Sequence, residues 1–353
     1  MDIYIIDNHG VVDIIDVYES VVWNMQYFGP NDFEIVLPCT DANVDRITAG
    51  TMLVRGTDAT PELFKNVMRV EGIKIDFDAD KGWKMTITGG GLKKIVGQRI
   101  VWEQMNLTGN VETAIRSVIT DNLISPASNA RRITGLELGD VKGFTDTFDI
   151  QLFGENIAEW LEETCKTYGY GWDVYKKRAG GYLFELYQGE NRTFNQTENT
   201  PVIFSPTYDN LVNSSYTYEK AEFKNAAKVG GEGEGTSQRT ATVGTATGLD
   251  RFEEYIDGSS VSSNGEIITA EQYTAMLEDY GKEQLTGTNF TETFEGQVIN
   301  NGMYTFGVDY FLGDVVQIDN SFVSATSRII EMIYAEDTNG STLTPTFTDW
   351  EVL

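Results

Sequence analysis

The chain has 353 residues, of which 41% are hydrophobic, and a net charge of −28. This length predicts about two to four domains, each with its own core. The acidic excess argues against a nucleic-acid-binding surface, which would be basic, and against docking on anionic lipid. The apolar runs fall short of the roughly 20 residues that cross a bilayer, and the opening residues lack a signal-peptide pattern. We therefore expect a chain that is made in the cytoplasm and does not insert into a membrane.

Residues that commonly bind metals or perform catalysis are scarce. Cys39 and Cys165 lie far apart and form no CxxC pair, so we expect two free thiols that pack as small hydrophobic groups. The single histidine, His9, precedes Gly10 in a predicted turn, whereas a zinc site or a Ser–His triad needs histidine at an organised site. The sequence thus predicts no catalytic residue, no metal ligand and no cofactor.

Residues 1–103 have the pattern of a β domain. Short segments alternate apolar and polar residues, as Phe33, Ile35 and Leu37 do before Pro38. Turn signals such as Gly29–Asp32 separate these segments. Many short strands joined by regular turns favour a barrel or a sandwich.

Two motifs in this domain resemble ligand loops. Asp76, Asp78 and Asp80 have the alternate spacing of a calcium loop, but Lys81 stands where the loop glycine belongs. A hairpin turn is therefore favoured. Gly89–Gly91 joins a strand to a helical segment, as in a phosphate-binding loop, yet it matches no nucleotide motif. Crowding at a strand-to-helix corner is the favoured interpretation of these glycines.

Residues 104–200 have the pattern of an α+β layer. The apolar spacing predicts one helix over Val111–Ile124, capped by Asn110, and a second over Asn156–Tyr168. Strands are predicted over Tyr170–Tyr175 and Tyr182–Tyr187. Two helices would then cover one small sheet.

The pattern of residues 202–235 predicts the start of a second β domain. A turn at Ser205–Pro206 precedes a strand in which Tyr216 and Tyr218 share one face, and a further strand ends at Val229. The glycine-rich residues after it break the strand pattern. We expect this stretch to open a β-barrel, which the chain leaves as an insertion and rejoins near Phe290.

The insertion at residues 231–289 is acidic and rich in Ser, Thr and Gly. Ala270–Leu285 has the spacing of a stable helix capped by Thr269, and Arg251–Tyr255 is a possible strand. The remainder, around residues 236–265, has the composition of a mobile loop. Strands resume from residue 290, with a hairpin-type turn at Asn300–Gly302 and a long strand over Ser327–Tyr334.

The order of these segments along the whole chain resembles that of the siphovirus tail-hub family. This family is related to the baseplate hub of contractile phages and to the N-terminal part of tail-associated lysins. Each supporting motif is short, and the resemblance rests on their order: Trp83-Lys-Met-Thr-Ile-Thr-Gly, Leu92…Gln98-Arg99, Gly189-Glu-Asn-Arg-Thr, Val202-Ile-Phe-Ser, Asn225-Ala-Ala-Lys-Val-Gly-Gly, Leu312-Gly-Asp-Val-Val and Ser327-Arg-Ile-Ile.

The resemblance implies a mainly β fold with α+β layers. Two β-barrel domains of tail-hub type would form from residues 1–103 and from residues 201–230 joined to 290–353. Residues 104–200 would form an α+β domain with two helices, and residues 231–289 an inserted acidic loop-and-helix region. Many relatives carry a peptidoglycan-cleaving or host-binding region beyond this core, and the sequence shows none.

The resemblance also implies a structural role at the tail tip of a phage or of a phage-tail-like bacteriocin. Three copies would form a ring of six barrels that joins a six-fold tail tube to a three-fold tip. The expected partners are the chain itself, the tail tube or distal tail protein ring, the tape measure protein, and a spike, fiber or receptor-binding tip protein. DNA would only pass through the channel, whose carboxylates would repel the phosphate backbone.

Two other functions remain open from the residues alone. A glycan-cleaving enzyme could use a carboxylate pair such as Glu232 with Glu234 or Asp146 with Asp149, although so acidic a chain contains such pairs by chance. A carbohydrate-binding protein could use surface aromatic residues, but Trp160 and Trp172 are most simply interpreted as core residues, as are most tyrosines.

Overall fold

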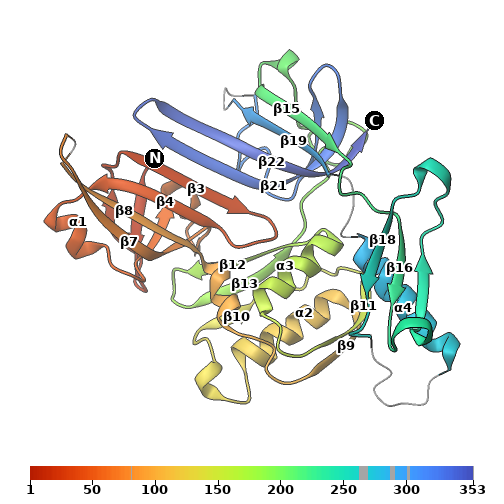
Figure 1. Ribbon diagram of the computed structural model, residues 1–353. Helices are drawn as coiled ribbons and strands as arrows, with labels where there is room; N and C mark the ends of the chain where they lie inside the picture. Colours follow the sequence, from red (N-terminus) through yellow and green to blue (C-terminus); the bar gives the residue numbers. More distant parts are fainter. Residues whose placement is uncertain (81, 262–268, 287–290, 300–302, 353) are drawn as a thin grey trace. The chain divides into compact units, whose positions relative to one another are not determined.

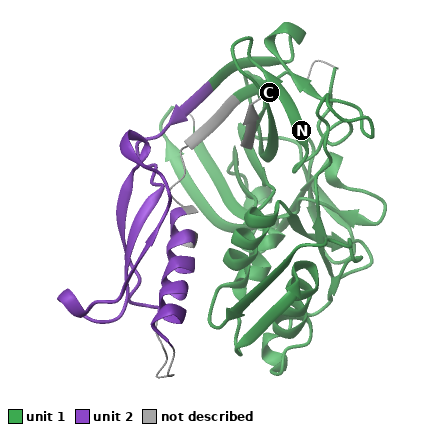
Figure 2. Ribbon diagram, turned by 90° about the vertical axis from the view of Figure 1, so that its right-hand side faces the viewer, with its two compact units in different colours: residues 1–215, 295–353 green, residues 216–294 purple. Residues whose placement is uncertain are grey.

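The computed structural model describes residues 1–80, 82–261, 269–286, 291–299 and 303–352 (Figure 1). The chain divides into two compact units (Figure 2). Unit 1 comprises Met1–Ser215 and Glu295–Leu353, and unit 2 comprises Tyr216–Phe294. The fold is mainly β, with several sheets and four α-helices in the described part of the chain, as expected.

Unit 1 is built on one large sheet that takes strands from both ends of the chain. Its strand order is β15-β19-β22-β21-β3-β4-β8-β7-β5-β1-β2, and β20 attaches β14 to β21. The early strands are β1 (Ile3–Ile6), β2 (Val11–Ile15), β3 (Ser20–Gln26), β4 (Asp32–Pro38), β5 (Met52–Arg55), β7 (Met68–Asp78) and β8 (Gly82–Gly91). The later strands are β14 (Ile203–Phe204), β15 (Leu211–Glu219), β19 (Thr291–Val298), β20 (Val315–Asp319), β21 (Ser324–Asp337) and β22 (Gly340–Val352).

The long strand β21 joins the two sets of strands. The first part of β21 pairs with β20, so that Ser324 lies opposite Asp319. On the same edge, the last part of β21 pairs with β3, so that Asp337 lies opposite Ser20. Its other edge pairs with β22 along its length. Strands before and after the insertion therefore lie in one sheet, since β14 also pairs with β20. Closure of these strands into two barrel domains stays a prediction.

Alternation of side chains builds the core of the early strands. Phe33, Ile35 and Leu37 of β4 are almost completely buried, whereas Glu34 between them is exposed. This is the pattern of a strand with one face on the core. The short helix α1 (Asp41–Arg46) after β4 was not predicted from the sequence.

The α+β layer contains the two predicted helices. α2 (Val111–Ile119) continues into a π-helical turn, η3 (Thr120–Ile124), and α3 covers Ile157–Tyr168. Asn110 caps α2 by accepting a hydrogen bond from the Thr113 amide at 2.9 Å, as expected. α3 ends at Gly169, which has a φ of +70°, in the left-handed region that glycine adopts without strain.

Two small sheets complete this layer. The four-stranded sheet has the order β10-β13-β12-β6, with β6 (Leu63–Phe64), β10 (Leu136–Leu138), β12 (Gly171–Lys177) and β13 (Tyr182–Tyr187). The second sheet pairs β9 (Met105–Asn110) with β11 (Thr147–Leu152). β12 and β13 confirm the predicted strands, whereas β9, β10 and β11 were not predicted.

Unit 2 contains a three-stranded sheet and one helix. β16 (Ala226–Gly230) pairs with β17 (Thr240–Val243) and with β18 (Glu253–Asp257), while α4 (Ala270–Thr286) supplies Tyr273 and Leu277 to their common core. The predicted helix and the possible strand at Arg251–Tyr255 are thus present. Thr269 caps the helix, because its hydroxyl accepts from the Gln272 amide at 3.2 Å.

The strand that ends near Val229 requires a correction. We expected it in the second barrel with Val202–Glu219, but β16 pairs with β17 and β18 instead. The physical reason lies in the side chains of Ala227 and Val229, which are buried in the core of unit 2. The hairpin-type turn expected at Asn300–Gly302 lies outside the described residues.

A prediction follows for Tyr273, whose hydroxyl ties the sheet of unit 2 to its helix. It accepts from the Glu232 amide at 2.8 Å and donates to the Val261 carbonyl at 2.6 Å. Replacing Tyr273 with phenylalanine leaves both partly buried backbone groups without this partner, so we expect the free energy of opening of unit 2 to fall by about 1–3 kcal/mol. Hydrogen exchange at the amides of β16 and β17 measures this loss.

The matched control is Tyr280→Phe on the same helix. Tyr280 is partly buried against the same core, and its hydroxyl has no hydrogen-bond partner among the described residues. Its exchange rates should stay close to those of the parent protein. Equal protection in both variants would show that the two hydrogen bonds of Tyr273 contribute nothing to the stability of unit 2.

Candidate functional site

The turn at Gln26–Gly29, between β3 and β4, is where distant segments of unit 1 meet. Lys93 lies in the 3-10 helix η2 (Leu92–Gln98) and is completely buried. Its ammonium donates to the carbonyls of Gln26 at 2.6 Å, Tyr27 at 3.2 Å and Gly29 at 3.0 Å. One side chain therefore satisfies three backbone acceptors of a buried turn.

The α+β layer binds the same turn. The indole nitrogen of Trp172 on β12 donates to the Phe28 carbonyl at 2.6 Å. The Trp172 ring centroid lies 5.2 Å from the Lys93 ammonium, within the range of a cation–π contact. Trp172 is completely buried, which confirms its predicted place in the core.

Burial sets the electrostatics of Lys93. Desolvation lowers the pKa of its ammonium to about 8, and the nearby Asp173 carboxylate opposes this effect. The ammonium thus remains the protonated donor that the three carbonyls require at neutral pH. The neighbouring Cys165 is a buried free thiol, as predicted, and burial raises its pKa to about 12, so it stays protonated and unreactive.

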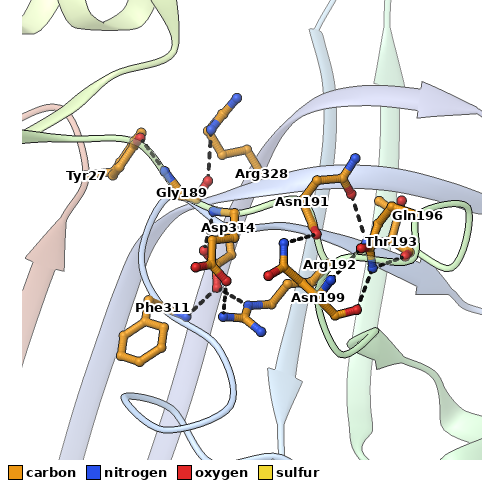
Figure 3. A network of polar contacts seen from close by, with 12 residues as sticks. Tyr27, Gly189, Asn191, Arg192, Thr193, Gln196, Asn199, Phe311, Asp314 and Arg328 are labelled. Carbon is orange, nitrogen blue, oxygen red and sulfur yellow. Dashed lines mark hydrogen bonds and ion pairs between the residues drawn. The ribbon is translucent and has the colours of Figure 1, made fainter. Parts of the chain in front are cut away.

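Tyr27 connects this turn to the later part of the chain. Its hydroxyl accepts from the Gly189 amide at 3.2 Å (Figure 3). It also donates to the Gly169 carbonyl at 3.1 Å. The guanidinium of Arg328, on β21, lies 5.8 Å from the centroid of the Tyr27 ring. Burial raises the pKa of Tyr27 to about 12, so the hydroxyl keeps its proton and can serve both partners.

Asp314 holds two of the sequence motifs together. Its carboxylate accepts from the Glu190 amide at 2.7 Å, from Arg192 Nε at 2.7 Å and from the Phe311 amide at 2.9 Å (Figure 3). Burial raises the pKa of Asp314, and the backbone and Arg192 hydrogen bonds oppose that rise. The hydrogen bond between Arg192 and Asp314 fixes how the two side chains are oriented, because guanidinium donors and carboxylate acceptors have fixed geometry.

Close backbone contact accompanies this ion pair. A Cβ added at Gly189 would lie 1.9 Å from the carbonyl carbon of Gly313, so only glycine fits there. Arg328 donates to the Gly313 carbonyl at 2.8 Å. The Arg192 amide donates to the Val315 carbonyl at 2.7 Å, which continues the contact along β20.

The loop after Arg192 is fixed by its own side chains. The side-chain amide nitrogen of Gln196 donates to the carbonyls of Thr193 at 3.0 Å and Asn199 at 2.8 Å (Figure 3). Asn199 in turn donates to the Asn191 carbonyl at 3.1 Å. The loop is therefore held in one conformation as it leads toward β14.

The side chains of this junction hold segments of the chain in place. The cations and carboxylates described above are engaged with one another and with the backbone, and the buried thiol and hydroxyl beside them keep their protons. Among the described residues no group of three or more His, Cys, Asp or Glu side chains is placed to hold a metal ion. The arrangement fixes three segments of unit 1 relative to one another.

The two motifs that resemble ligand loops, at Asp76–Asp80 and at Gly89–Gly91, have structural roles. Asp78 accepts from the Asp80 amide at 2.9 Å within the β7–β8 hairpin, and Asp76 pairs with Lys74. This confirms the predicted hairpin. A Cβ added at Gly89 would lie 1.9 Å from the Arg69 carbonyl oxygen, which confirms crowding as the reason for that glycine.

The carboxylates of the glycosidase hypothesis do not line the large cavity that the described residues form in unit 1. Asp146 accepts a hydrogen bond from Tyr170, and Asp149 is exposed on β11. Glu232 pairs with Arg239 at 3.7 Å, while Glu234 is exposed. His9 lies in the predicted turn, where its amide donates to Asp7 at 2.6 Å.

Sequence reasoning did not predict the roles of Lys93 and Asp314. Both lie inside motifs that support the family resemblance, Leu92…Arg99 and Leu312-Gly-Asp-Val-Val. One feature of the sequence could have indicated these roles. A charged residue inside a short apolar motif is expected to be buried, and a buried charge needs a partner. Nothing in the sequence identifies that partner, because the contacts span many residues.

Solved structures with a similar fold include tail proteins and a type VI secretion component. The 43 kDa tail protein of prophage MuSo2 from Shewanella oneidensis gives a TM-score of 0.60 at 12% identity, over 99% of this chain and 98% of that one. The tail protein from Neisseria meningitidis MC58 gives 0.58 at 11%, over 99% and 96%. The E. coli c3393 protein, a type VI secretion component described as similar to the T4 tail proteins gp27 and gp5, gives 0.50 at 9%, over 99% and 77%. The chain therefore has the fold of a phage tail protein.

The sequence also matches the family described as Siphovirus ReqiPepy6 Gp37-like protein, over residues 2–348. The chain belongs to this family of siphovirus tail proteins, which confirms the resemblance drawn from its motifs. No curated protein matches the sequence. In the described part of the chain, no helix has both the length and the apolar character needed to span a bilayer.

Proposed function

We propose that this protein is a structural hub of the tail tip or baseplate of a phage or phage-tail-like particle. Three copies form a ring in which two similar barrels per chain match the six-fold tail tube on one side and a three-fold tip on the other. The observation that best supports this structural role is the junction at Gln26–Gly29, where hydrogen bonds tie the early strands to the α+β layer and to β21. A ring that adapts symmetry needs such a fixed geometry within each chain.

An uncovered strand supports self-association. β7 pairs with β5 only at Met68 and Arg69, so the edge of β7 beyond them has no partner strand among the described residues. On this hairpin Phe77 is 61% exposed and packs against Trp83, which is 59% exposed, with 5.0 Å between ring centroids. Exposed edges with apolar side chains pair readily with other chains, and natural proteins usually cover them.

The other partners follow from the same role. We propose contacts with the tail tube or distal tail ring above, the tape measure protein within, and a spike, fiber or receptor-binding tip below. DNA crosses the channel without binding, since a chain of net charge −28 repels phosphate. In this proposal the protein acts without catalysis and is located in the virion tail tip.

The mass of the purified protein in solution tests the ring. Light scattering after size-exclusion chromatography should give the mass of three chains. Phe77→Asp should shift the protein toward the monomer, because it places a charge on the uncovered apolar edge. The matched control is Phe153→Asp, since Phe153 is also exposed, at 66%, but lies after β11.

Two results would count against the proposal. A monomer at high concentration that also fails to bind tail-tube or distal-tail proteins would refute the ring. A trimer that both variants leave intact would retain the ring but remove the β7 edge from its interface.

A further inference from the structure

A cavity of about 1020 Å³ lies in unit 1 beside the junction. Its wall is formed by the segment after β5, by β12 and β13, and by the loop that precedes β20. Ligand-binding cavities in proteins commonly reach this size. Nothing in the proposed hub function uses it.

One wall of the cavity is a face of the four-stranded sheet. The register of β12 and β13 places Asp173 opposite Glu185, and side chains two residues apart on a strand share a face, so Tyr175 and Tyr187 lie on the same side. All four side chains line the cavity. The opposite face carries Trp172 and the other buried apolar residues of these strands, namely Val174, Phe184 and Leu186.

Asp173 is the unusual member of this wall. It is only 7% exposed, and its sole hydrogen bond among the described residues comes from the Val174 amide to Oδ1 at 2.7 Å. Glu185, opposite to it, pairs with Lys142. A carboxylate that is nine-tenths buried is costly without a counter-ion, and like charges on opposed strand positions add to the cost.

Two nearby lysines attract Asp173 without forming an ion pair with it. Burial raises the pKa of the Asp173 carboxyl, and the charges of Lys93 and Lys65 oppose this rise. Arg55 pairs with Asp58 at 2.6 Å, and the Lys93 ammonium donates to three carbonyls. The Lys65 ammonium lies 5.7 Å from the centroid of the Tyr175 ring. In the part of the chain that the structure describes, Asp173 therefore has no ion-pair partner, although it lines a cavity large enough to admit one.

We propose that this cavity binds a linear aliphatic polyamine, one ammonium of which pairs with Asp173. The aromatic rings of Tyr175, Tyr187 and Phe306 suit the methylene chain and the cations between them. A second ammonium reaches the carboxylate of Glu190, which lines the cavity after β13 and would share this carboxylate with Arg192. The cavity is large, has aromatic side chains in its wall and carries carboxylates at separate positions. These features fit a long, multiply charged amine better than a compact cation. The proposal does not depend on the hub function.

Titration calorimetry of the full chain with spermidine tests this site, at about 0.15 M salt so that diffuse attraction to an acidic protein is screened. We expect one saturable site. Asp173→Asn should weaken spermidine about 10- to 100-fold, as expected for loss of a hydrogen bond to a charged group. Asp45→Asn removes the same charge from an exposed position on α1 and should leave the affinity unchanged.

A second variant keeps the test valid if Asp173→Asn fails to fold. Val308 lines the cavity and is 71% exposed, so Val308→Lys introduces a competing ammonium without disturbing the core. It should weaken spermidine by a similar factor, whereas Val141→Lys, at a 67% exposed position outside the cavity, should not. Equal binding by all variants, or binding that never saturates, would overturn the proposal and show only diffuse attraction to the acidic surface.

Discussion

Replacing Lys93 with methionine is expected to lower the free energy of unfolding of unit 1 by about 3 kcal/mol or more. The methionine fills a similar volume but donates nothing, so the carbonyls of Gln26, Tyr27 and Gly29 lose their shared donor inside the core. Each unsatisfied buried acceptor costs about 1–3 kcal/mol, offset in part by removal of the buried charge. Urea unfolding monitored by tryptophan fluorescence measures the change, since Trp172 packs on Lys93.

The neighbouring residue supplies the control. Lys94 forms an exposed ion pair with Glu71, in which the two side chains are 40% and 46% exposed. Lys94→Met should therefore change stability by less than about 1 kcal/mol. If Lys93→Met were as mild as Lys94→Met, the turn at Gln26–Gly29 would not be the fixed point of the junction.

Replacing Asp314 with asparagine should destabilise unit 1 by about 2–4 kcal/mol, because it breaks a buried ion pair and its hydrogen bonds. Asp314 is 1% exposed and accepts three hydrogen bonds, from two backbone amides and from Arg192. Asparagine offers one acceptor oxygen and turns an NH₂ group toward at least one of these donors, which also leaves Arg192 without its buried counter-charge. Thermal unfolding by calorimetry measures the loss.

Glu190→Gln is the matched change in the same cluster. Glu190 contacts the other side of Arg192, but its side chain is 54% exposed. We expect this variant to lose less than about 1 kcal/mol, because solvent screens an exposed pair. A loss equal to that of Asp314→Asn would mean that Arg192 is held from the solvent side, and not by the motif around Asp314.

Local patterns predicted the elements whose signals are local. The 3.6-residue spacing and the caps Asn110 and Thr269 located α2 and α4, because each cap acts within three residues of itself. β16 was assigned to the wrong sheet because pairing is a long-range property. The glycines after Val229 do end the strand, since β16 stops at Gly230. A Cβ at Gly231 would lie 2.7 Å from the Tyr273 hydroxyl, so this glycine also provides room beneath α4.

The junction was beyond prediction for the same reason. Lys93 reaches a turn 67 residues earlier in the chain, and Asp314 bonds an amide 124 residues earlier. Trp172 is most simply interpreted from the sequence as a core residue, yet its hydrogen bond to Phe28 depends on how the layer meets the β strands. The order of the motifs supported the family, whereas the contacts among the motifs appear only in three dimensions.

The most direct test of the central claim is a three-dimensional reconstruction of the purified oligomer by electron cryomicroscopy. The hub proposal predicts a three-fold ring with six similar barrels around one channel, one from residues 1–103 of each chain and one from the strands of residues 201–219 and 291–352. A ring of another symmetry, or one in which these two parts of the chain form dissimilar structures, would contradict it.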